Sequence, residues 1–370
     1  MNRKEFLKKG LLGTGGLALG GLTLGSCTTN NSGQDIAVDD RTYTWRMATV
    51  WGKNFPVFGE SANLFADIVE KMSQGRMKIK IFGAGELCPA MQTFYATSVG
   101  TTEMGAGASY YWQGIDPAAV FFTAVPFGMN AQQIQSWLLG GKGEGYTLWK
   151  ALYAKYNLVP FPAGNSGVQM GGWFNREINS VDDLKGLKMR IPGMAGKVIE
   201  KVGGAAINVP GGEIYTNLER GVIDATEWVG PYHDYKLGLN KAAKYYYTPG
   251  WHETGSQLEF IVNKDAYDEL PIYLQEILMA ASMQVHVWVL SEFDAMNGEF
   301  LEKIIDSGTE IRHFPPDVLQ RLKQATQEVL ADYIRDNPSA KPIYESYTAF
   351  QNKIRPWSKL TEQAYYNSIM

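Results

Sequence analysis

Cysteine and histidine are scarce in this chain, which has 2 Cys and 4 His among 370 residues. Two cysteines cannot build a disulfide framework. No two histidines have the HxxH or HExxH spacing of a metal site, which disfavours a zinc centre built from histidine. The four dispersed histidines are His233, His252, His286 and His313.

An excess of basic residues is also lacking, because Lys+Arg 34 stand against Asp+Glu 38 and the net charge is -4. A nucleic-acid-binding surface needs a basic face, so this balance disfavours that class of protein. The glycine pairs at 203–204 and 211–212 do not match the GxGxxG dinucleotide fingerprint. Hydrophobic residues make up 45% and charged residues 19%, which is typical of a globular protein and excludes a disordered chain. The length favours two domains.

The N-terminal segment predicts an export signal that is not part of the fold. Arg3, Lys4, Lys8 and Lys9 precede a run of Gly, Leu, Ala and Thr over 10–24, which is too short and glycine-rich to span a bilayer. A buried N-terminal helix is the alternative, but seven glycines in the first 26 residues disfavour it. No later stretch is long and apolar enough to cross a membrane.

The run ends in Leu24-Gly25-Ser26-Cys27, which resembles a bacterial lipobox. We therefore expect residues 1–26 to be a lipoprotein signal peptide and residues 27–42 a flexible tether, with the lipid on Cys27 as a membrane anchor in the periplasm. The start, Arg3-Lys4-Glu5-Phe6-Leu7-Lys8, resembles a twin-arginine signal with Lys4 in place of the second Arg, which leaves the Tat and Sec routes open. Cys88 would then be the lone thiol of the globular part, which excludes a structural disulfide.

Hydrophobic patterning of the remaining chain predicts an α/β fold. Apolar and polar residues alternate over 43–47 and over 77–81, which predicts two strands with a helix between them. The apolar face of that helix is Leu64, Phe65, Ile68, Val69 and Met72. A β-α-β order favours a parallel sheet with helices on its faces. A second block repeats the pattern with strands at 187–191 and 222–226.

The strand predicted at 258–263 returns to the first block, and from Leu270 onward the pattern is helical. The expected organisation is a first lobe at 43–166 plus 254–310, a second lobe at 167–253, and C-terminal helices at 311–370. A heptad-like stripe in the last part predicts either a helix packed on its own core or a helix between subunits. The stripe is Ile343, Tyr347, Phe350, Ile354 and Trp357, and Pro356 should kink or end it.

Polar residues follow several predicted strands, at the end where open α/β sheets bind ligands. Arg190 precedes Pro192-Gly193 and can hold a carboxylate through two parallel hydrogen bonds, although a solvated strand arginine is the alternative. Glu227 follows a buried-looking strand, and Glu253 follows an aromatic run. A lone glutamate is more often on a solvated face. The glycine pair Gly171-Gly172 permits close backbone approach beside these groups.

Four segments together resemble the solute receptors of TRAP transporters. They are Gln169-Met170-Gly171-Gly172-Trp173-Phe174, the DLKGLKMR run at 183–190, Glu227-Trp228-Val229-Gly230-Pro231 and Trp251-His252-Glu253. The first and third resemble the branch of this family that binds 2-oxoacids or 2-hydroxyacids with a metal ion. The similarity covers essentially the whole mature chain. It implies a two-lobed, periplasmic-binding-protein-like fold with a ligand cleft between the lobes and a C-terminal helical extension.

The resemblance also implies roles for individual residues. Arg190 matches the arginine that grips the ligand carboxylate. The metal-binding positions are matched by Gln169, Glu227, the backbone carbonyl of Trp228, and Glu253. Tyr110 and Tyr111, followed by Trp112, match an aromatic segment of the cleft. One departure is Thr254, where family members often have proline.

Charge balance agrees with a cation in this site. A 2-oxoacid brings one negative charge that Arg190 balances, and Glu227 and Glu253 would then leave an excess negative charge that repels the ligand. Carboxylate, amide and carbonyl oxygens are hard ligands that suit Na⁺ or Ca²⁺ and do not suit zinc. A cation bridging the ligand's carboxylate and its 2-oxygen would select against simple fatty acids.

The leading hypothesis is an exported or lipid-anchored receptor for a pyruvate- or lactate-like acid, which closes by a hinge motion and is presented to the membrane permease subunits. Some members of the resembled branch form dimers by swapping a C-terminal helix, and the stripe from Ile343 to Trp357 makes a homodimer the expectation here. One alternative is an enzyme that acts on a small carboxylic acid with Glu227 and Glu253 as an acid–base pair, although no Ser/His/Asp or Cys/His order supports it. A lectin-like or signalling receptor is a third possibility.

Overall fold

The computed structural model of the protein describes residues 41–207 and 209–369. The predicted signal peptide, Cys27 and residues 28–40 of the predicted tether lie outside the described residues. None of the helices within the described ranges combines the length and the hydropathy that a membrane span requires. Cys88 is a half-buried free thiol.

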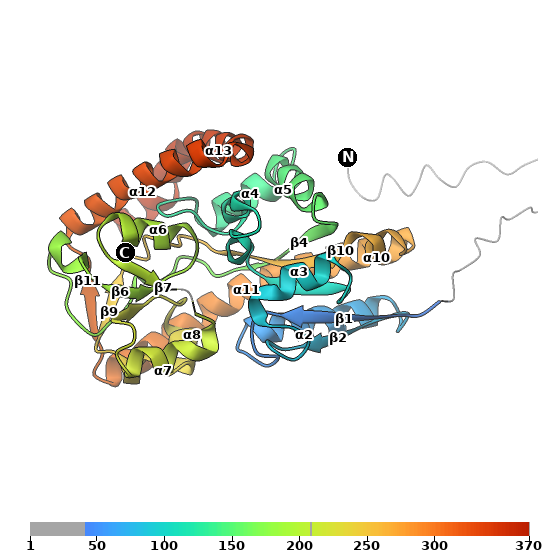
Figure 1. The fold of residues 1–370 in the computed structure, drawn as a ribbon, viewed down its shortest axis with the longest axis horizontal. Helices are drawn as coiled ribbons and strands as arrows, with labels where there is room; N and C mark the ends of the chain where they lie inside the picture. Colours follow the sequence, from blue (N-terminus) through green and yellow to red (C-terminus); the bar gives the residue numbers. More distant parts are fainter. Residues whose placement is uncertain (1–40, 208, 370) are drawn as a thin grey trace, which may run out of the picture. The chain divides into compact units, whose positions relative to one another are not determined.

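The first sheet has the strand order β2-β1-β3-β10-β4 (Figure 1). β1 pairs in parallel with β2 and β3, and α2 connects β1 to β2, as the β-α-β pattern predicts. α2 buries Phe58, Ala62, Phe65 and Val69. The bounds are β1 Tyr43–Thr49, α2 Phe58–Met72, β2 Met77–Phe82, β3 Met104–Gly107, β4 Leu158–Asn165 and β10 Gln257–Asn263.

β10 confirms the prediction of a returning strand, but it makes the first sheet mixed where a parallel sheet was expected. β10 is antiparallel to both of its neighbours, β3 and β4. The reason is the chain path: β4 leaves the first sheet towards the second at Asn165, and β10 comes back beside it at Gln257. The two crossing segments therefore lie side by side at one edge of the sheet.

The second sheet has the order β11-β9-β5-β8-β6-β7. Its strands are short, with bounds β5 Gly172–Phe174, β6 Lys188–Arg190, β7 Ala205–Ile207, β8 Ala225–Thr226, β9 Tyr245–Thr248 and β11 Glu310–His313. The strand predicted over 222–226 is reduced to β8. The backbone N–H groups of Val222 and Ile223 donate to the carbonyl of Asn217, so they close the preceding helix and do not join the sheet.

β11 lies in a region where only helices were predicted. It pairs in parallel with β9, from Glu310 opposite Tyr245 to His313 opposite Thr248. Its residues are half-buried or exposed, because it is an edge strand of the second sheet. Such a short strand with one apolar residue, Ile311, shows no alternation of apolar and polar residues that the sequence could reveal. Its pairing with β9 is what defines it as a strand.

Helices cover both sheets and connect them (Figure 1). The long helix α11, Ile272–Asp306, contacts β4 of the first sheet and α8, Pro231–Lys236, beside the second. α12, Pro316–Asp336, packs on α6, Gly193–Lys201. The other helices are α3 Thr93–Ser98, α4 Ala131–Leu139, α5 Glu144–Ala154, α7 Ile214–Glu219, α9 Leu239–Ala242, α10 Lys264–Asp268, α13 Lys341–Leu360 and α14 Glu362–Ile369.

Helix α13 continues through Pro356, so of the two outcomes predicted for this proline, a kink or an end of the helix, the end does not occur. Pro356 and Asn352, whose carbonyl loses its helical partner, are both exposed, so water can replace the missing hydrogen bond. The first half of α13 packs on its own chain: Tyr347 is buried, and its hydroxyl accepts a hydrogen bond from Met129 N at 2.9 Å. In the second half Trp357 is 61% exposed.

Candidate ligand and cation site

The ends of strands from both sheets meet around one small buried cavity. Trp51 and Tyr110 follow β1 and β3 of the first sheet, while Arg190 ends β6 and Glu227 follows β8 of the second. The cavity has a volume of about 10 Å³, room for about one water molecule. It is lined by Trp51, Phe58, Tyr110, Tyr111, Gln169, Arg190, Trp228, Val229, Ser256 and Leu258. Five of the seven predicted ligand-site residues are in this lining.

Arg190 is 1% exposed, so it is not the solvated strand arginine that was the alternative. Its Nη1 donates to the carboxylate of Glu227, and its Nε donates to the carbonyl of Val209 at 3.3 Å. The guanidinium carbon lies 5.2 Å from the ring centre of Trp228. Nη1 also approaches the backbone carbonyl of Glu227 at 3.4 Å.

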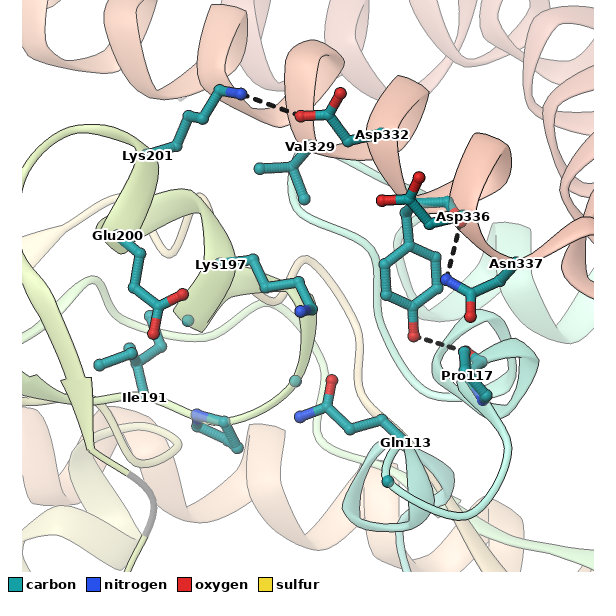
Figure 2. A pocket seen from close by; sticks show the side chains of 16 residues that line it. Gln113, Pro117, Ile191, Lys197, Glu200, Lys201, Val329, Asp332, Asp336 and Asn337 are labelled. Atoms are coloured by element: carbon teal, nitrogen blue, oxygen red, sulfur yellow. Dashed lines mark hydrogen bonds and ion pairs between the residues drawn. The ribbon is translucent and has the colours of Figure 1, made fainter.

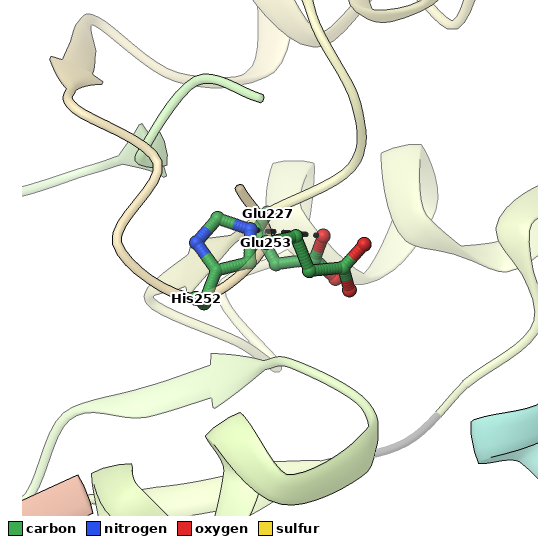
Figure 3. Close-up of side chains that lie close together, drawn as sticks. All are labelled: Glu227, His252 and Glu253. Atoms are coloured by element: carbon green, nitrogen blue, oxygen red, sulfur yellow. Dashed lines mark ion pairs between the residues drawn. The ribbon is translucent and has the colours of Figure 1, made fainter. Parts of the chain in front are cut away.

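Glu227 and Glu253, the two predicted metal-binding carboxylates, lie in one cluster with His252 (Figure 3). One ligand atom from each of the three side chains can be chosen so that all three lie within 4.8 Å of one another. His252 Nε2 is 3.4 Å from Glu227 Oε2, and the imidazole is fully buried. His252 is not among the residues predicted from the sequence, although its position next to Glu253 is a signal that could have indicated it.

Gln169 faces Glu253 through its amide nitrogen. Gln169 Nε2 donates to Glu253 Oε2 at 2.8 Å and to Ser166 Oγ at 3.0 Å, and Ser256 Oγ donates to the same carboxylate oxygen. Burial and the nearby charge of Glu227 raise the pKa of Glu253 above its usual range. Ser256 and Ser166 were not predicted as site residues.

The donor set of this cluster fits a hard cation. Gln169 Oε1 is buried and has no hydrogen-bond partner among the described residues. A buried acceptor without a partner is costly, and a cation is one group that satisfies it. Two carboxylates and an amide oxygen are the ligand types of Na⁺ and Ca²⁺. A positive ion would also reverse the charge effect that raises the pKa of Glu253.

Backbone contacts hold the segments of the site together. Gln169 N donates to the carbonyl of Glu253 at 3.2 Å, and Met170 N donates to the carbonyl of Val229 at 3.1 Å. Gly172 has a φ of 112°, and a Cβ there would lie 2.5 Å from the carbonyl oxygen of Thr226. The close approach expected from the glycine pair is therefore present, since any larger residue at 172 would push β5 away from Glu227.

Tyr110 and Tyr111 form the wall from the first sheet. Their rings pack edge to face with centres 4.7 Å apart, and burial raises the pKa of both phenols, so both stay neutral. Gly193, with a φ of 64°, starts α6 directly against Tyr110, where an added Cβ would lie 3.3 Å from the tyrosine Cβ. The turn after β3 and the start of α6 therefore touch at the edge of the site.

Two further residues of the site region have contacts that the sequence alone did not indicate. Thr254, the departure from the resembled family, donates from Oγ1 to the carbonyl of Met129 at 2.9 Å, a contact that proline cannot make. Asp234 is buried and accepts hydrogen bonds from Trp173 Nε1 at 2.9 Å and Val229 N at 3.1 Å, so it fixes the segment that follows Trp228.

A second and much larger cavity, about 800 Å³, lies next to the site and is open to solvent (Figure 2). It runs between α6, α12 and the segment 113–117. Lys201 of α6 pairs with Asp332 of α12 at 2.9 Å, and Tyr333 Oη donates to the carbonyl of Pro117 at 2.7 Å. The two cavities share no lining residue, and Arg190 lines only the small one. The large cavity is therefore not a candidate for the site where Arg190 binds a ligand.

Comparison with known proteins assigns this architecture to a class. Residues 47–336 match the family of bacterial extracellular solute-binding proteins, family 7, which is also called DctP. The chain belongs to this family. The resemblance to solute receptors of TRAP transporters is thus confirmed, and so is the predicted α/β fold with its C-terminal helices.

Three relatives are similar over most of the chain. A monocarboxylate 2-oxoacid-binding periplasmic protein of Nostoc sp. is 42% identical, with 99% of this chain and 98% of the relative aligned. A TRAP periplasmic solute-binding protein of Colwellia psychrerythraea, solved with calcium and pyruvate, is 42% identical with a TM-score of 0.86. One from Pseudoalteromonas atlantica, solved with sodium and pyruvate, is 43% identical with the same score. Both structures cover 89% of this chain and 100% of their own.

Proposed function

We propose that this protein is the extracytoplasmic solute receptor of a TRAP transporter and that it binds a small 2-oxo or 2-hydroxy monocarboxylate. The observation that carries the proposal is the buried group of Arg190, Gln169, Glu227 and Glu253, which all belong to the part of the chain that builds the second sheet. Arg190 and Gln169 also line the small cavity that Tyr110 and Tyr111 close from the first sheet. Three relatives that are 42–43% identical, one described as 2-oxoacid-binding and two solved with pyruvate, support the substrate class.

Arg190 is the group that grips the ligand carboxylate. Its Nε and Nη1 are held by Val209 and Glu227, so the guanidinium plane is fixed before a ligand arrives. We assign Nη2 as the donor to the ligand carboxylate. The guanidinium is buried over the ring of Trp228, where an ion pair is screened far less than in water.

The cation is Na⁺ or Ca²⁺, held by Gln169 Oε1, the carboxylates of Glu227 and Glu253, and the backbone carbonyl of Trp228. When bound, it supplies a positive charge that the carboxylate and the 2-oxygen of a ligand can share. Gln169 is kept in the required orientation because its Nε2 is committed to Glu253 and Ser166. A simple fatty acid lacks the 2-oxygen and would lose this contact.

Tyr110 and Tyr111 complete the ligand wall from the first lobe. We place the first lobe at 43–166 and 254–310, the second lobe at 167–253 and the C-terminal helices at 311–370, with β11 adding an edge strand to the second sheet. Ligand binds between the lobes, which close by a hinge motion at the β4 and β10 crossings.

Isothermal titration calorimetry tests this function directly. Purified protein is titrated with pyruvate, 2-oxobutyrate, lactate and acetate, each with Ca²⁺, with Na⁺ and after treatment with a chelator in sodium-free buffer. We expect the first three acids to bind, acetate to bind much more weakly, and cation removal to abolish binding. Failure of every 2-oxo and 2-hydroxy acid to bind in the presence of either cation would refute the substrate class.

We also propose export with lipidation at Cys27, so that the receptor stays at the membrane beside its permease. The support is the lipobox-like sequence Leu24-Gly25-Ser26-Cys27 and the extracellular class of the family. Cys27→Ala should move the protein from the membrane fraction to the soluble periplasmic fraction. An unchanged distribution would argue against the anchor.

The receptor forms a homodimer through its C-terminal helices. The support is the exposed apolar end of the chain, where Trp357, Leu360 and Ile369 are 61%, 77% and 67% exposed. Burial of such side chains between two copies would be favourable.

A further inference from the structure

One buried side chain of the second lobe makes a hydrogen bond to the backbone of the first. His233 lies on α8 and is fully buried, and its Nε2 is 2.7 Å from the carbonyl oxygen of Pro56. Pro56 is in the segment between β1 and α2 of the first lobe. The two residues are 177 positions apart in the sequence. This contact crosses the boundary between the lobes.

The chemistry of the two groups fixes the direction of this bond. A carbonyl oxygen can only accept, so Nε2 carries the proton and donates. Burial lowers the pKa of His233 to about 3, so the imidazole is neutral near neutral pH. Nδ1 is then a bare lone pair, and it has no partner among the described residues. Burial of Nδ1 without a partner costs free energy. Water can donate to Nδ1 when the lobes separate, so opening recovers this cost and the closed arrangement is reversible.

The ring of His233 is also enclosed by aromatic side chains from both sides of the boundary. It packs edge to face against Phe55 at 5.2 Å and Phe58 at 4.5 Å in the first lobe, and lies 4.7 Å from Phe293 of α11. Phe58 lines the small cavity, and so does Trp228, whose ring is 6.4 Å from the imidazole. The contact therefore lies directly behind the ligand site.

We propose that the hydrogen bond from His233 to Pro56 is a latch that holds the lobes closed over the ligand and slows its release. The inference rests on the proposed receptor function. Opening has to separate α8 from the 55–58 segment, which breaks this bond and wets the aromatic cluster around it. Because the bond forms only after the lobes meet, it acts on the dissociation rate, while the association rate is set by diffusion into the open form.

Two substitutions separate the hydrogen bond from the ring that carries it. His233→Gln keeps an N–H donor at the place of Nε2 but loses the ring, and His233→Phe keeps the ring but loses the donor. The association and dissociation rates of pyruvate with Ca²⁺ are measured by stopped-flow tryptophan fluorescence for the wild type and both variants. Thermal unfolding without ligand reports on folding. His233→Asn, whose donor matches Nδ1, replaces His233→Phe if that variant does not fold.

The latch predicts that His233→Phe releases pyruvate roughly 3- to 10-fold faster, as expected for loss of one hydrogen bond, with an association rate within about twofold of the wild type. His233→Gln should restore most of the slow release. Equal release from wild type and His233→Phe would overturn the latch, and so would fast release from His233→Gln with slow release from His233→Phe. A wild type that binds no 2-oxoacid would overturn the receptor function instead, and the latch with it.

Discussion

Gln169 Nε2 donates a hydrogen bond to Glu253 Oε2 at 2.8 Å, and this bond determines which groups the amide oxygen of Gln169 can bind. With its nitrogen committed to a carboxylate, Gln169 presents Oε1 as a buried acceptor without a donor among the described residues. A carboxylate cannot approach such an acceptor favourably, and a cation can. This hydrogen bond therefore leaves Gln169 Oε1 as a candidate cation ligand beside the buried carboxylate of Glu253.

The first prediction concerns cation affinity. Glu253→Gln should weaken Ca²⁺ binding roughly tenfold or more, because the charge of the ligand set is a main determinant of Ca²⁺ affinity. Titration calorimetry with Ca²⁺ alone, without an organic ligand, measures the change. Glu259→Gln is the matched control, since Glu259 is equally buried but lies outside the cluster. Loss of Ca²⁺ affinity in the control as well would indicate a general effect of removing a buried carboxylate.

The second prediction concerns Arg190. Arg190→Met should reduce pyruvate affinity by roughly 30-fold to more than 1,000-fold, because truncation of a buried charged partner costs about 2–5 kcal/mol. Arg190→Lys should also bind weakly, since Lys cannot donate to Glu227, Val209 and the ligand in one plane. Fluorescence titration gives the dissociation constants.

Arg176→Met serves as the control for Arg190. Arg176 is an exposed arginine of the second lobe, so this change should leave affinity unaltered. Wild-type affinity in a folded Arg190→Met variant would exclude Arg190 from the site.

The sequence was sufficient to predict the strands and helices whose apolar residues recur with a clear spacing. β1 and β2 alternate, and Arg190 could be placed at a strand end because the strand before it alternates apolar and polar residues. Glu227 also follows a strand, although β8 is only two residues long where five were predicted. The sequence placed His252 next to Glu253 but did not predict its contact with Glu227, since that contact depends on how the loop after β9 folds back. β11 was missed for a similar reason: its pairing with β9 is set by tertiary structure.

The sequence pattern also did not predict that an acidic residue outside the site would be buried. Glu259 alternates with apolar residues in β10, yet it is 1% exposed. Its carboxylate accepts from Ser109 Oγ at 2.7 Å, Trp112 Nε1 at 2.5 Å and Tyr153 Oη at 2.8 Å. Ser109 and Trp112 flank Tyr110 and Tyr111, so Glu259 fixes the turn that carries these two tyrosines. Only the folded arrangement of three distant segments makes this burial tolerable.

The third prediction is a pH dependence from Glu259. Burial raises the pKa of Glu259 to about 7, and its hydrogen bonds only partly offset this effect. The folded state therefore keeps a proton that the unfolded state loses near pH 4.5, and its contribution to stability is lost as pH rises towards 7. The free energy of unfolding of the wild type relative to Glu259→Gln should fall over this range by at most about 3 kcal/mol. Urea titrations at pH 5 and pH 8 measure it, and a difference that grows with pH would contradict the assignment.

The last prediction concerns the C-terminal helices. One way to test a dimer is to truncate the chain before Ala340. This would also remove Ile343 and Tyr347, which pack in the core, so loss of the dimer could not be distinguished from loss of stability. The double variant Trp357→Glu/Leu360→Glu changes only exposed positions of α13. If two copies associate through this face, light scattering should show a dimer for the wild type and a monomer for the double variant, because buried carboxylates without partners are costly.

Ile272→Glu is the matched control for this surface. Ile272 is 76% exposed at the start of α11, and the change should leave the dimer intact. The thermal unfolding temperature of the double variant should stay near that of the wild type at high dilution, where the wild type is also monomeric. The reason is that neither side chain is part of the core. A monomeric wild type at micromolar concentration would refute the dimer, and a dimer that survives both glutamates would place the interface elsewhere on the chain.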